Sequence, residues 1–201
     1  MKTTITMLFM LLLTVQLPAQ EWNFGIKGGV NIANFTGSDA DDLDLKSRTG
    51  FHLGGLVEGK FSESFGAQLE VLYSTAGAKV EGIFMDDMGN EFDGDITFKL
   101  DYISVPVLFK YFPIQELSIE TGPQISFETS SEVEAEAMGE SVSLDFEDET
   151  SSVEFGWLFG LGYDLPYNIF VQARYLYGLS DVYDESNLKH SVFQISLGYK
   201  F

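Results

Sequence analysis

Apolar and polar residues alternate over most of the chain, and the alternation is clearest near its end. From Phe193 onward every second residue is apolar or aromatic, and the residues between are polar or glycine. A period of two places one class of residue on each face of a β-strand. From residue 21 onward, stretches of this kind predict eight strands, at residues 22–34, 50–61, 65–79, 96–112, 117–129, 151–165, 169–179 and 190–201.

The connections between these strands alternate in length. Three are short turns, at residues 62–64, 113–116 and 166–168, and four are long loops, at residues 35–49, 80–95, 130–150 and 180–189. This pattern is typical of outer-membrane barrels, whose turns are periplasmic and whose loops are extracellular. Most of the strands reach the length of about 9–11 residues that a tilted strand needs to cross a bilayer. Because only closed barrels pair every backbone group of a membrane sheet, we predict an all-β fold, an eight-stranded antiparallel transmembrane β-barrel with both termini periplasmic.

The charge is sorted between strands and loops. The chain has a formal net charge of −20, and the four long loops account for −2, −6, −8 and −2 of it, or −18 together. The strands are therefore nearly neutral, whereas a soluble acidic protein would spread its carboxylates over all faces. The two central loops keep some alternation around residues 88–90 and 138–140, which predicts hairpins that continue the barrel wall. Binding of nucleic acid is disfavoured, because phosphates need the opposite charge.

Residues 1–20 have the pattern of a secretory signal peptide, and residues 21–201 form the predicted barrel domain. Lys2 precedes an apolar stretch at residues 5–17 and a small-residue exit at residues 18–20. The stretch is shorter than the about 20 residues of a membrane-spanning helix. The alternative is an N-terminal helix that stays buried or anchors the chain. The chain has no cysteine, which excludes disulfides, thiolate catalysis and cysteine metal sites.

Charged residues fall on the polar face of the predicted strands, Lys60, Lys200, Glu154 and Asp164 among them, and six others are expected to form one network. A basic side chain facing lipid near the midplane costs about 2–4 kcal/mol, so we place this face toward the interior. Buried charges without partners are costly, and we expect the three glutamates to pair with the three cations. The favoured interpretation is a structural network that fills a narrow lumen; the alternative is an ion or proton path. The six residues are Lys27, Glu58, Glu70, Lys110, Glu120 and Arg174.

Several segments of the sequence resemble a known family. The signal peptide, WNFGIKGGVNIANF from Trp22, LDYISVPVLFKYF from Leu100 and FQISLGYKF from Phe193 look like the PorT-like (porin-like) small outer-membrane β-barrels. The likeness covers essentially the whole mature chain, and the family has no catalytic motif to carry over. The closing strand also resembles the signal that hands such barrels to the barrel-assembly machinery. Its outward residues are Phe193, Ile195, Leu197, Tyr199 and Phe201.

Candidate chemistry is sparse. Some small barrels modify lipids with a histidine, a serine and an acid, and His190 and Ser191 are adjacent in the chain. We favour His52 and His190 as rim residues without a catalytic role, so no enzyme is expected. The acidic run at residues 39–44 lacks the glycine and closing glutamate of an EF-hand. We expect no cofactor and no metal site, although loose divalent bridging between acidic loops and lipopolysaccharide stays open.

Together these patterns predict a monomer in the cell outer membrane, delivered by Sec-type export and signal-peptide cleavage. Its neighbours are outer-membrane lipid and lipopolysaccharide. The favoured role is structural or interactive, through acidic extracellular loops that contact an unidentified extracellular or envelope partner. The alternatives are a small diffusion pore, a lipid-modifying enzyme and an accessory of a secretion system.

Overall fold

The computed structural model describes residues 21–37, 45–85, 91–137, 140–145, 153–180 and 188–201. The expected signal peptide and the acidic run at residues 39–44 lie outside them. None of the helical segments among the described residues is long and apolar enough to cross a membrane. The elements are β1 (Glu21–Thr36), β2 (Leu45–Lys60), β3 (Phe65–Met85), β4 (Glu91–Ile114), β5 (Leu117–Ala137), β6 (Glu140–Asp145), β7 (Val153–Asp164), the 3-10 turn η1 (Pro166–Asn168), β8 (Ile169–Gly178) and β9 (Lys189–Lys200).

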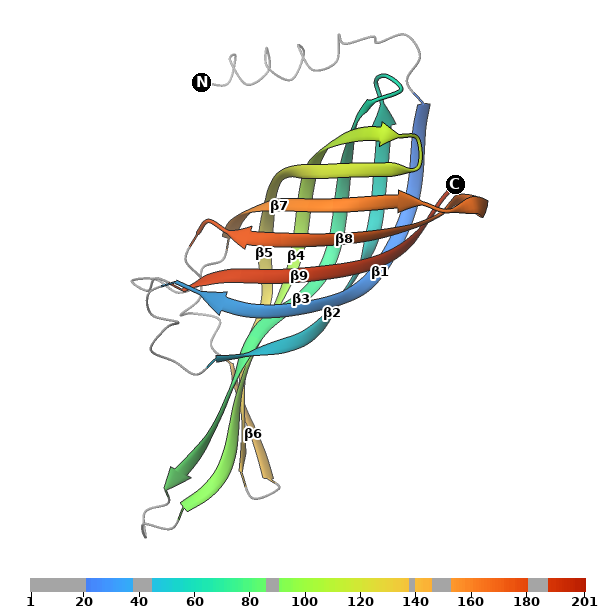
Figure 1. Cartoon of the computed structure of the whole chain (residues 1–201). Coiled ribbons are helices and arrows are strands. Elements are labelled where there is room, and N and C mark those ends of the chain that lie inside the picture. Colours follow the sequence, from blue (N-terminus) through green and yellow to red (C-terminus); the bar gives the residue numbers. More distant parts are fainter. Residues whose placement is uncertain (1–20, 38–44, 86–90, 138–139, 146–152, 181–187) are drawn as a thin grey trace, which may run out of the picture.

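Eight of the strands form a closed ring. Each strand pairs antiparallel with the next, β4 pairs with β5, β5 pairs with β7, and β9 closes the ring on β1. The prediction of an eight-stranded antiparallel barrel is therefore confirmed (Figure 1). Within the described residues, β6 pairs with β5 alone and stands outside the ring.

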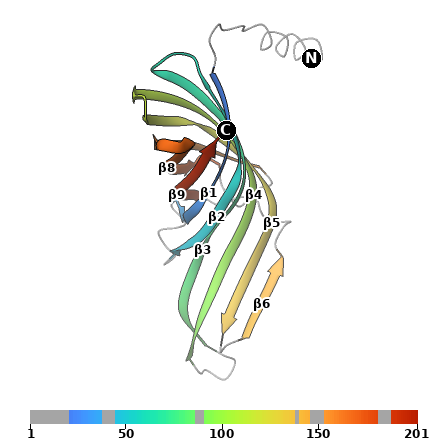
Figure 2. The ribbon, with the colours of Figure 1, turned by 90° about the vertical axis from the view of Figure 1, so that its right-hand side faces the viewer.

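The hairpins predicted in the two central loops are confirmed, and they make several strands longer than the sequence suggested. Pairing of β3 with β4 continues to Met85 and Glu91. Pairing of β5 with β6 continues to Ala137 and Glu140, past Phe127, where the pairing of β5 with β7 stops. Figure 2 shows this four-stranded extension curving away from the rest of the barrel.

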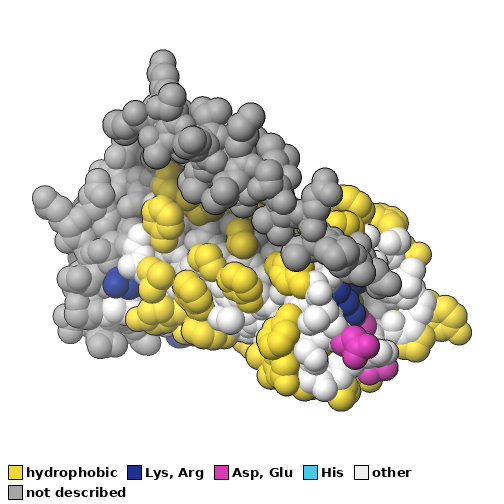
Figure 3. Space-filling view, turned by 90° about the horizontal axis from the view of Figure 1, so that it is seen from above, with side chains coloured by type: hydrophobic (Ala, Val, Ile, Leu, Met, Phe, Trp, Pro, Cys, Tyr) yellow, Lys and Arg dark blue, Asp and Glu magenta, His cyan; other side chains and the backbone are white. Residues whose placement is uncertain are grey.

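Side chains alternate between the two faces as the sequence predicted. In β7 and β8 nearly every second residue is buried and the residues between are exposed. Phe155 and Leu161 on the outer face are 55% and 53% exposed, whereas Leu158 on the inner face is 1% exposed. Apolar side chains therefore cover the outside of the wall, and Figure 3 shows them over much of the described surface, with acidic side chains gathered in one small area. An apolar outer band is the surface that lipid requires.

The two ends of the barrel differ, and we name them the short-turn end and the long-loop end. The short-turn end holds the connections at residues 61–64 and 115–116 and the turn η1. Pro113 and Ile114, predicted to lie in a turn, still belong to β4. In η1, Tyr167 and Asn168 adopt the left-handed backbone conformation, with φ of 67° and 62°. That conformation is uncommon for residues other than glycine, and here it reverses the chain tightly between β7 and β8.

Candidate functional site in the barrel interior

All six charged residues expected to face the interior lie buried there, and the structure brings them together. Arg174, Lys27, Glu70 and Glu120 are each 1% exposed, Glu58 is 0% exposed and Lys110 is 3% exposed. They come from β1, β2, β3, β4, β5 and β8, so almost the whole ring contributes. Their side chains meet because inward positions converge on the axis of a narrow barrel.

Arg174 joins the two glutamates at the centre of this group. Its Nη1 atom lies 2.8 Å from Oε1 of Glu70, and its Nη2 atom lies 2.7 Å from Oε2 of Glu120. The Nε atom also donates to Oε2 of Glu120, over 2.8 Å. On the far side of Glu70, the Lys27 ammonium lies 2.9 Å from Oε2. A planar guanidinium that engages two carboxylates is a geometry that lysine does not reproduce.

The same chain of ion pairs continues toward the short-turn end. The Lys110 ammonium lies 3.0 Å from Oε1 of Glu120 and 2.5 Å from Oε2 of Glu58. The Lys200 ammonium lies 3.1 Å from Oε1 of Glu58 and 2.8 Å from Oδ1 of Asp164. The eight residues thus alternate in sign from Lys27 to Asp164. With four cations and four anions, this series of ion pairs has no net charge. We call it the ion-pair chain; its members in order are Lys27, Glu70, Arg174, Glu120, Lys110, Glu58, Lys200 and Asp164.

Two buried amides complete the hydrogen bonding of the ion-pair chain. Gln172 accepts from Lys27 over 3.3 Å and donates to Oε1 of Glu120 over 3.0 Å. Gln68 accepts from Lys110 over 3.0 Å and donates to Oε1 of Glu70. These bonds matter because a buried ion pair offsets its desolvation only when its other donors and acceptors are also satisfied.

Glycines on the inner face of β7 make room for the charged side chains. A Cβ atom at Gly162 would lie 2.5 Å from Oγ of Ser118 and 2.6 Å from Oε1 of Glu120, and one at Gly160 would lie 2.5 Å from Cγ of Arg174. Such distances are far inside van der Waals contact. The sequence therefore places glycine where the large residues of the facing strands need the space.

Between the ion-pair chain and the long-loop end lies a layer of mostly uncharged side chains, which also holds the buried carboxylate of Glu154. His52 bonds to Oδ1 of Asn31 through Nδ1, over 2.7 Å, and to Oγ of Ser196 through Nε2, over 2.8 Å. Next to it, residues from β1, β3, β4, β7, β8 and β9 form an apolar cluster. That cluster contains Ala33, Phe35, Ala76, Ala78, Leu100, Tyr102, Leu108, Leu158, Leu176 and Val192.

The expectation that both histidines lie at the rim is wrong for His52. The side chain is 1% exposed, because β2 begins at Leu45 and residue 52 is already inside the wall. His190 is also buried, at 3% exposed, and its Nε2 lies 3.2 Å from the hydroxyl of Tyr102 and 3.5 Å from Oε1 of Glu154. Ser191 is on the opposite face, where its hydroxyl lies 2.8 Å from that of Tyr175. His190 and Ser191 therefore do not meet.

Sequence reasoning placed Lys200 and Asp164 on the inner face but did not include them in the charged network. β7 and β9 are separated by β8, and the pairing of Asp164 with Phe170, and of Phe170 with Gly198, brings the two ends to one level. The sequence signal for this ion pair would have been two opposite charges on inner faces, both at the short-turn end and two strands apart.

The outward residues of the closing strand are exposed on the apolar surface, at 42% for Phe193 and Tyr199, 54% for Ile195, 60% for Leu197 and 68% for Phe201.

Comparison with solved structures finds other small barrels. Neisserial surface protein A (NspA) is 16% identical, with a TM-score of 0.54, over 92% of this chain and 100% of NspA. Ail of Yersinia pestis, solved with the heparin analogue sucrose octasulfate, is 19% identical over 90% of this chain and 99% of Ail, with a TM-score of 0.49. OprG of Pseudomonas aeruginosa is 15% identical over 92% and 98%, with a TM-score of 0.43. The likeness to NspA supports the fold alone.

A comparison with curated protein sequences gives no match. The family model described as "Outer membrane protein beta-barrel domain" matches residues 18–184. That range covers most of the barrel described above, whose apolar outer band and closed ring are those of a membrane barrel. The chain belongs to this family of outer-membrane β-barrel proteins, and its location is the cell outer membrane.

Proposed function

We propose that the protein is a monomeric outer-membrane barrel with a closed interior, which acts through its acidic extracellular loops rather than as a conduit. The observation that carries the proposal is the continuous ion-pair chain, which joins one residue from each of the eight ring strands. An ion that entered the lumen would have to displace a buried partner. Leaving a buried charge without its partner costs about 3–5 kcal/mol.

The apolar cluster supports the same proposal at the long-loop end. Leu100, Leu158 and Val192 are no more than 2% exposed, and they belong to β4, β7 and β9, on different sides of the ring. Apolar side chains that meet across a lumen exclude water, and a dehydrated constriction blocks ions.

The loops provide the interaction surface in this proposal. They hold −18 of the chain's charge of −20, and the β3–β4 and β5–β6 hairpins extend part of that charge beyond the ring (Figure 2). Lys79 pairs with Asp95 and Lys99 with Glu134 on this extension, over 2.9 Å and 2.5 Å. The remaining carboxylates favour a basic partner or divalent cations shared with lipopolysaccharide, because complementary charge steers association.

Conductance separates this proposal from a small diffusion pore. Purified wild-type protein in planar bilayers is expected to show no steady current. A stable, ion-selective channel would overturn the closed interior and establish the pore. Arg174→Ala is the informative variant, because it breaks the ion-pair chain at its centre and leaves the apolar cluster intact. Current in this variant alone would place the barrier at the ion pairs.

The finer alternatives have their own tests. We propose that the protein is not an enzyme, since His190 and Ser191 lie on opposite faces; a mass change of lipid A on expression would contradict this. We propose membership among the PorT-like barrels on the basis of the signal peptide and the three sequence segments quoted above. A role beside a secretion system, and delivery by the barrel-assembly machinery, are tested by pull-down with the intact folded barrel.

A further inference from the structure

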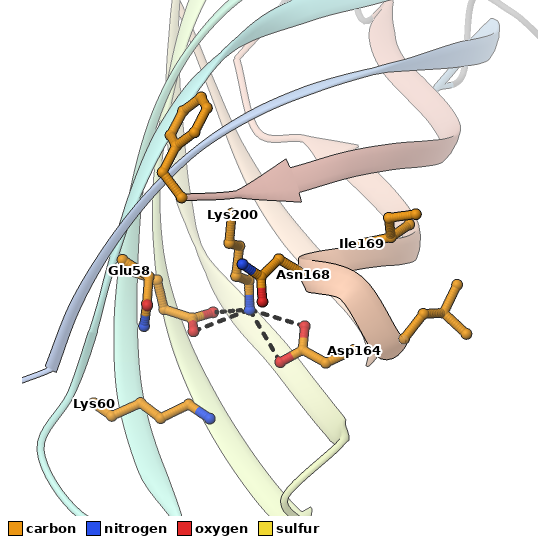
Figure 4. A pocket seen from close by; sticks show the side chains of 9 residues that line it. Glu58, Lys60, Asp164, Asn168, Ile169 and Lys200 are labelled. Atoms are coloured by element: carbon orange, nitrogen blue, oxygen red, sulfur yellow. Dashed lines mark hydrogen bonds and ion pairs between the residues drawn. The ribbon is translucent and has the colours of Figure 1, made fainter.

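A pocket opens at the short-turn end, opposite the acidic loops. It encloses about 270 Å³ between the ends of β1, β2, β7 and β9 and the turn η1. Figure 4 shows Lys200 between Glu58 and Asp164, with Asn168 beside them and Lys60 reaching in from β2. In an outer-membrane barrel this end faces the periplasm, so the pocket is open to periplasmic solutes and to the envelope beneath the membrane.

The two lysines of the pocket differ in how their charge is balanced. The Lys200 ammonium makes four contacts with the carboxylates of Glu58 and Asp164, between 2.8 Å and 3.2 Å. The Lys60 ammonium has no ion pair with any side chain that the structure describes; its recorded contact is with the ring of Phe112, 4.4 Å from the centroid. A ring face attracts the charge but leaves the ammonium's hydrogen-bond donors unused.

Two side-chain amides beside Lys60 also have hydrogen-bond donors that no described side chain uses. Asn23 and Asn168 line the pocket, and no side-chain hydrogen bond joins either of them to another described residue. Asn168 is there because η1 holds it in the left-handed conformation. Among the side chains that the structure describes, the pocket thus combines one cation that has no ion pair with two amides that have no side-chain hydrogen bond, and its two carboxylates are already neutralised by Lys200 and by Lys110.

We propose that this pocket binds a carboxylate, with the Lys60 ammonium pairing to its oxygens and the amides of Asn23 and Asn168 donating hydrogen bonds. One unpaired cation matches a singly charged anion, and a doubly charged phosphate would keep one charge without a partner. The volume admits a carboxylate with a few further heavy atoms. Such a group occurs both on small free acids and at the end of a peptide of the envelope. The site lies at the opposite end from the acidic loops and is independent of their role.

The pocket is also placed where the protein's own field permits an anion. The loops that hold −18 of the −20 charges are at the other end of the barrel, farther than the Debye length of about 8 Å at physiological ionic strength. Near the pocket, Lys60, Lys110 and Lys200 face Glu58 and Asp164. Because Lys110 also pairs with Glu120, 3.0 Å away, these charges are about balanced, and an anion in the pocket does not meet the net negative charge that it would meet at the loops.

The test is a titration of the folded, isotope-labelled barrel in detergent micelles, followed through the side-chain amide signals of Asn23 and Asn168. Sodium acetate and N-acetyl-alanyl-alanine are the probes, and sodium chloride at equal ionic strength is the control. Saturable shifts with both carboxylates, and none with chloride, are expected. Equal affinity for the two points to a free acid, and tighter binding of the dipeptide points to a peptide terminus. Shifts with chloride of the same size would overturn the proposal.

Variants assign the effect to Lys60. Lys60→Gln is expected to weaken carboxylate binding at least about tenfold, the effect of losing one charged hydrogen bond, and Lys60→Arg is expected to retain it. Lys99→Gln removes one positive charge at the other end of the barrel and is expected to leave the affinity unchanged. Unchanged binding in a folded Lys60→Gln barrel would overturn the proposal. Glu21 lies opposite Lys60 in the β1–β2 register. A large gain in carboxylate affinity in Glu21→Gln would therefore show that the Glu21 carboxylate of the protein itself occupies the Lys60 ammonium.

Discussion

Removal of Arg174 is the perturbation that most directly probes the interior. The side chain is 1% exposed and holds Glu70 and Glu120 together, over 2.8 Å and 2.7 Å. Without it, Lys27 and Glu70 stay as a neutral pair. The rest of the ion-pair chain keeps two cations, Lys110 and Lys200, for three carboxylates. One buried negative charge is then uncompensated, and we expect Arg174→Ala to lower the free energy of unfolding by about 3–5 kcal/mol.

Gln172→Ala is the matched control. Gln172 is 3% exposed on the same face of β8 and bonds to Lys27 and Glu120, but its loss changes no charge. We expect a cost of about 1 kcal/mol for each neutral hydrogen bond. The measurement is urea-induced unfolding of the barrel in lipid vesicles, together with the temperature at which the folded, fast-migrating gel band disappears. Equal losses in the two variants would mean that Arg174 is hydrated and that the lumen is open.

A double variant separates charge from lost volume. Arg174→Ala with Glu120→Gln has the same cavity as Arg174→Ala, but it leaves Lys110 and Lys200 facing only Glu58 and Asp164. Neutrality is restored, so we expect the double variant to be more stable than Arg174→Ala alone. A double variant as unstable as the sum of its single changes would refute the explanation by charge, because independent effects add.

Three further predictions concern packing, orientation and assembly. Gly162→Val is expected to destabilise the barrel by about 1–3 kcal/mol by overpacking, because its Cβ would lie 2.6 Å from Oε1 of Glu120. Gly55→Ala is the control in the same urea assay and should be near neutral, because its Cβ would meet nothing nearer than 3.8 Å. Protease added to whole cells is expected to cut within residues 130–150, the long acidic segment that contains the β5–β6 hairpin beyond the ring and Gly139. Cutting only after permeabilisation would reverse the orientation. Deletion of Phe201 is expected to lower the amount of protein in the outer membrane without reducing export to the periplasm, and equal outer-membrane levels would refute an assembly signal.

The strands and their faces could be predicted because they depend on local pattern. A period of two is visible within ten residues, and the burial of side chains follows it throughout β8 and, except at Gly160 and Asp164, which are partly buried, in β7. Lengths were harder to predict. β4 begins at Glu91, whereas the sequence predicted a start at residue 96. The prediction was late because the glutamate and aspartate residues at the start of the strand are typical of a loop. Beyond the membrane, a strand no longer needs an apolar outer face, so the signal for its end is lost.

The partners within the lumen could not be predicted because they depend on the stagger between strands. The sequence places Lys110 and Glu120 on inner faces, but their direct pairing across β4 and β5 is set by how the barrel closes. Likewise Lys200 reaches Asp164 across an intervening strand only at the observed register. A shift of two residues would keep every side chain on its face and change every ion pair. Local alternation contains no information about that shift.

The contrast between a neutral interior and acidic loops follows from one physical rule applied in two environments. A carboxylate in an exposed loop is hydrated and screened by salt, so −18 charges can gather there. A carboxylate in the lumen has no such compensation, and each of Glu58, Glu70 and Glu120 lies within 3.1 Å of two cationic groups. Loop charges can therefore change one at a time with little effect on folding. A change at an interior charge requires a second change of opposite sign, so the interior should vary in pairs while the loops vary freely.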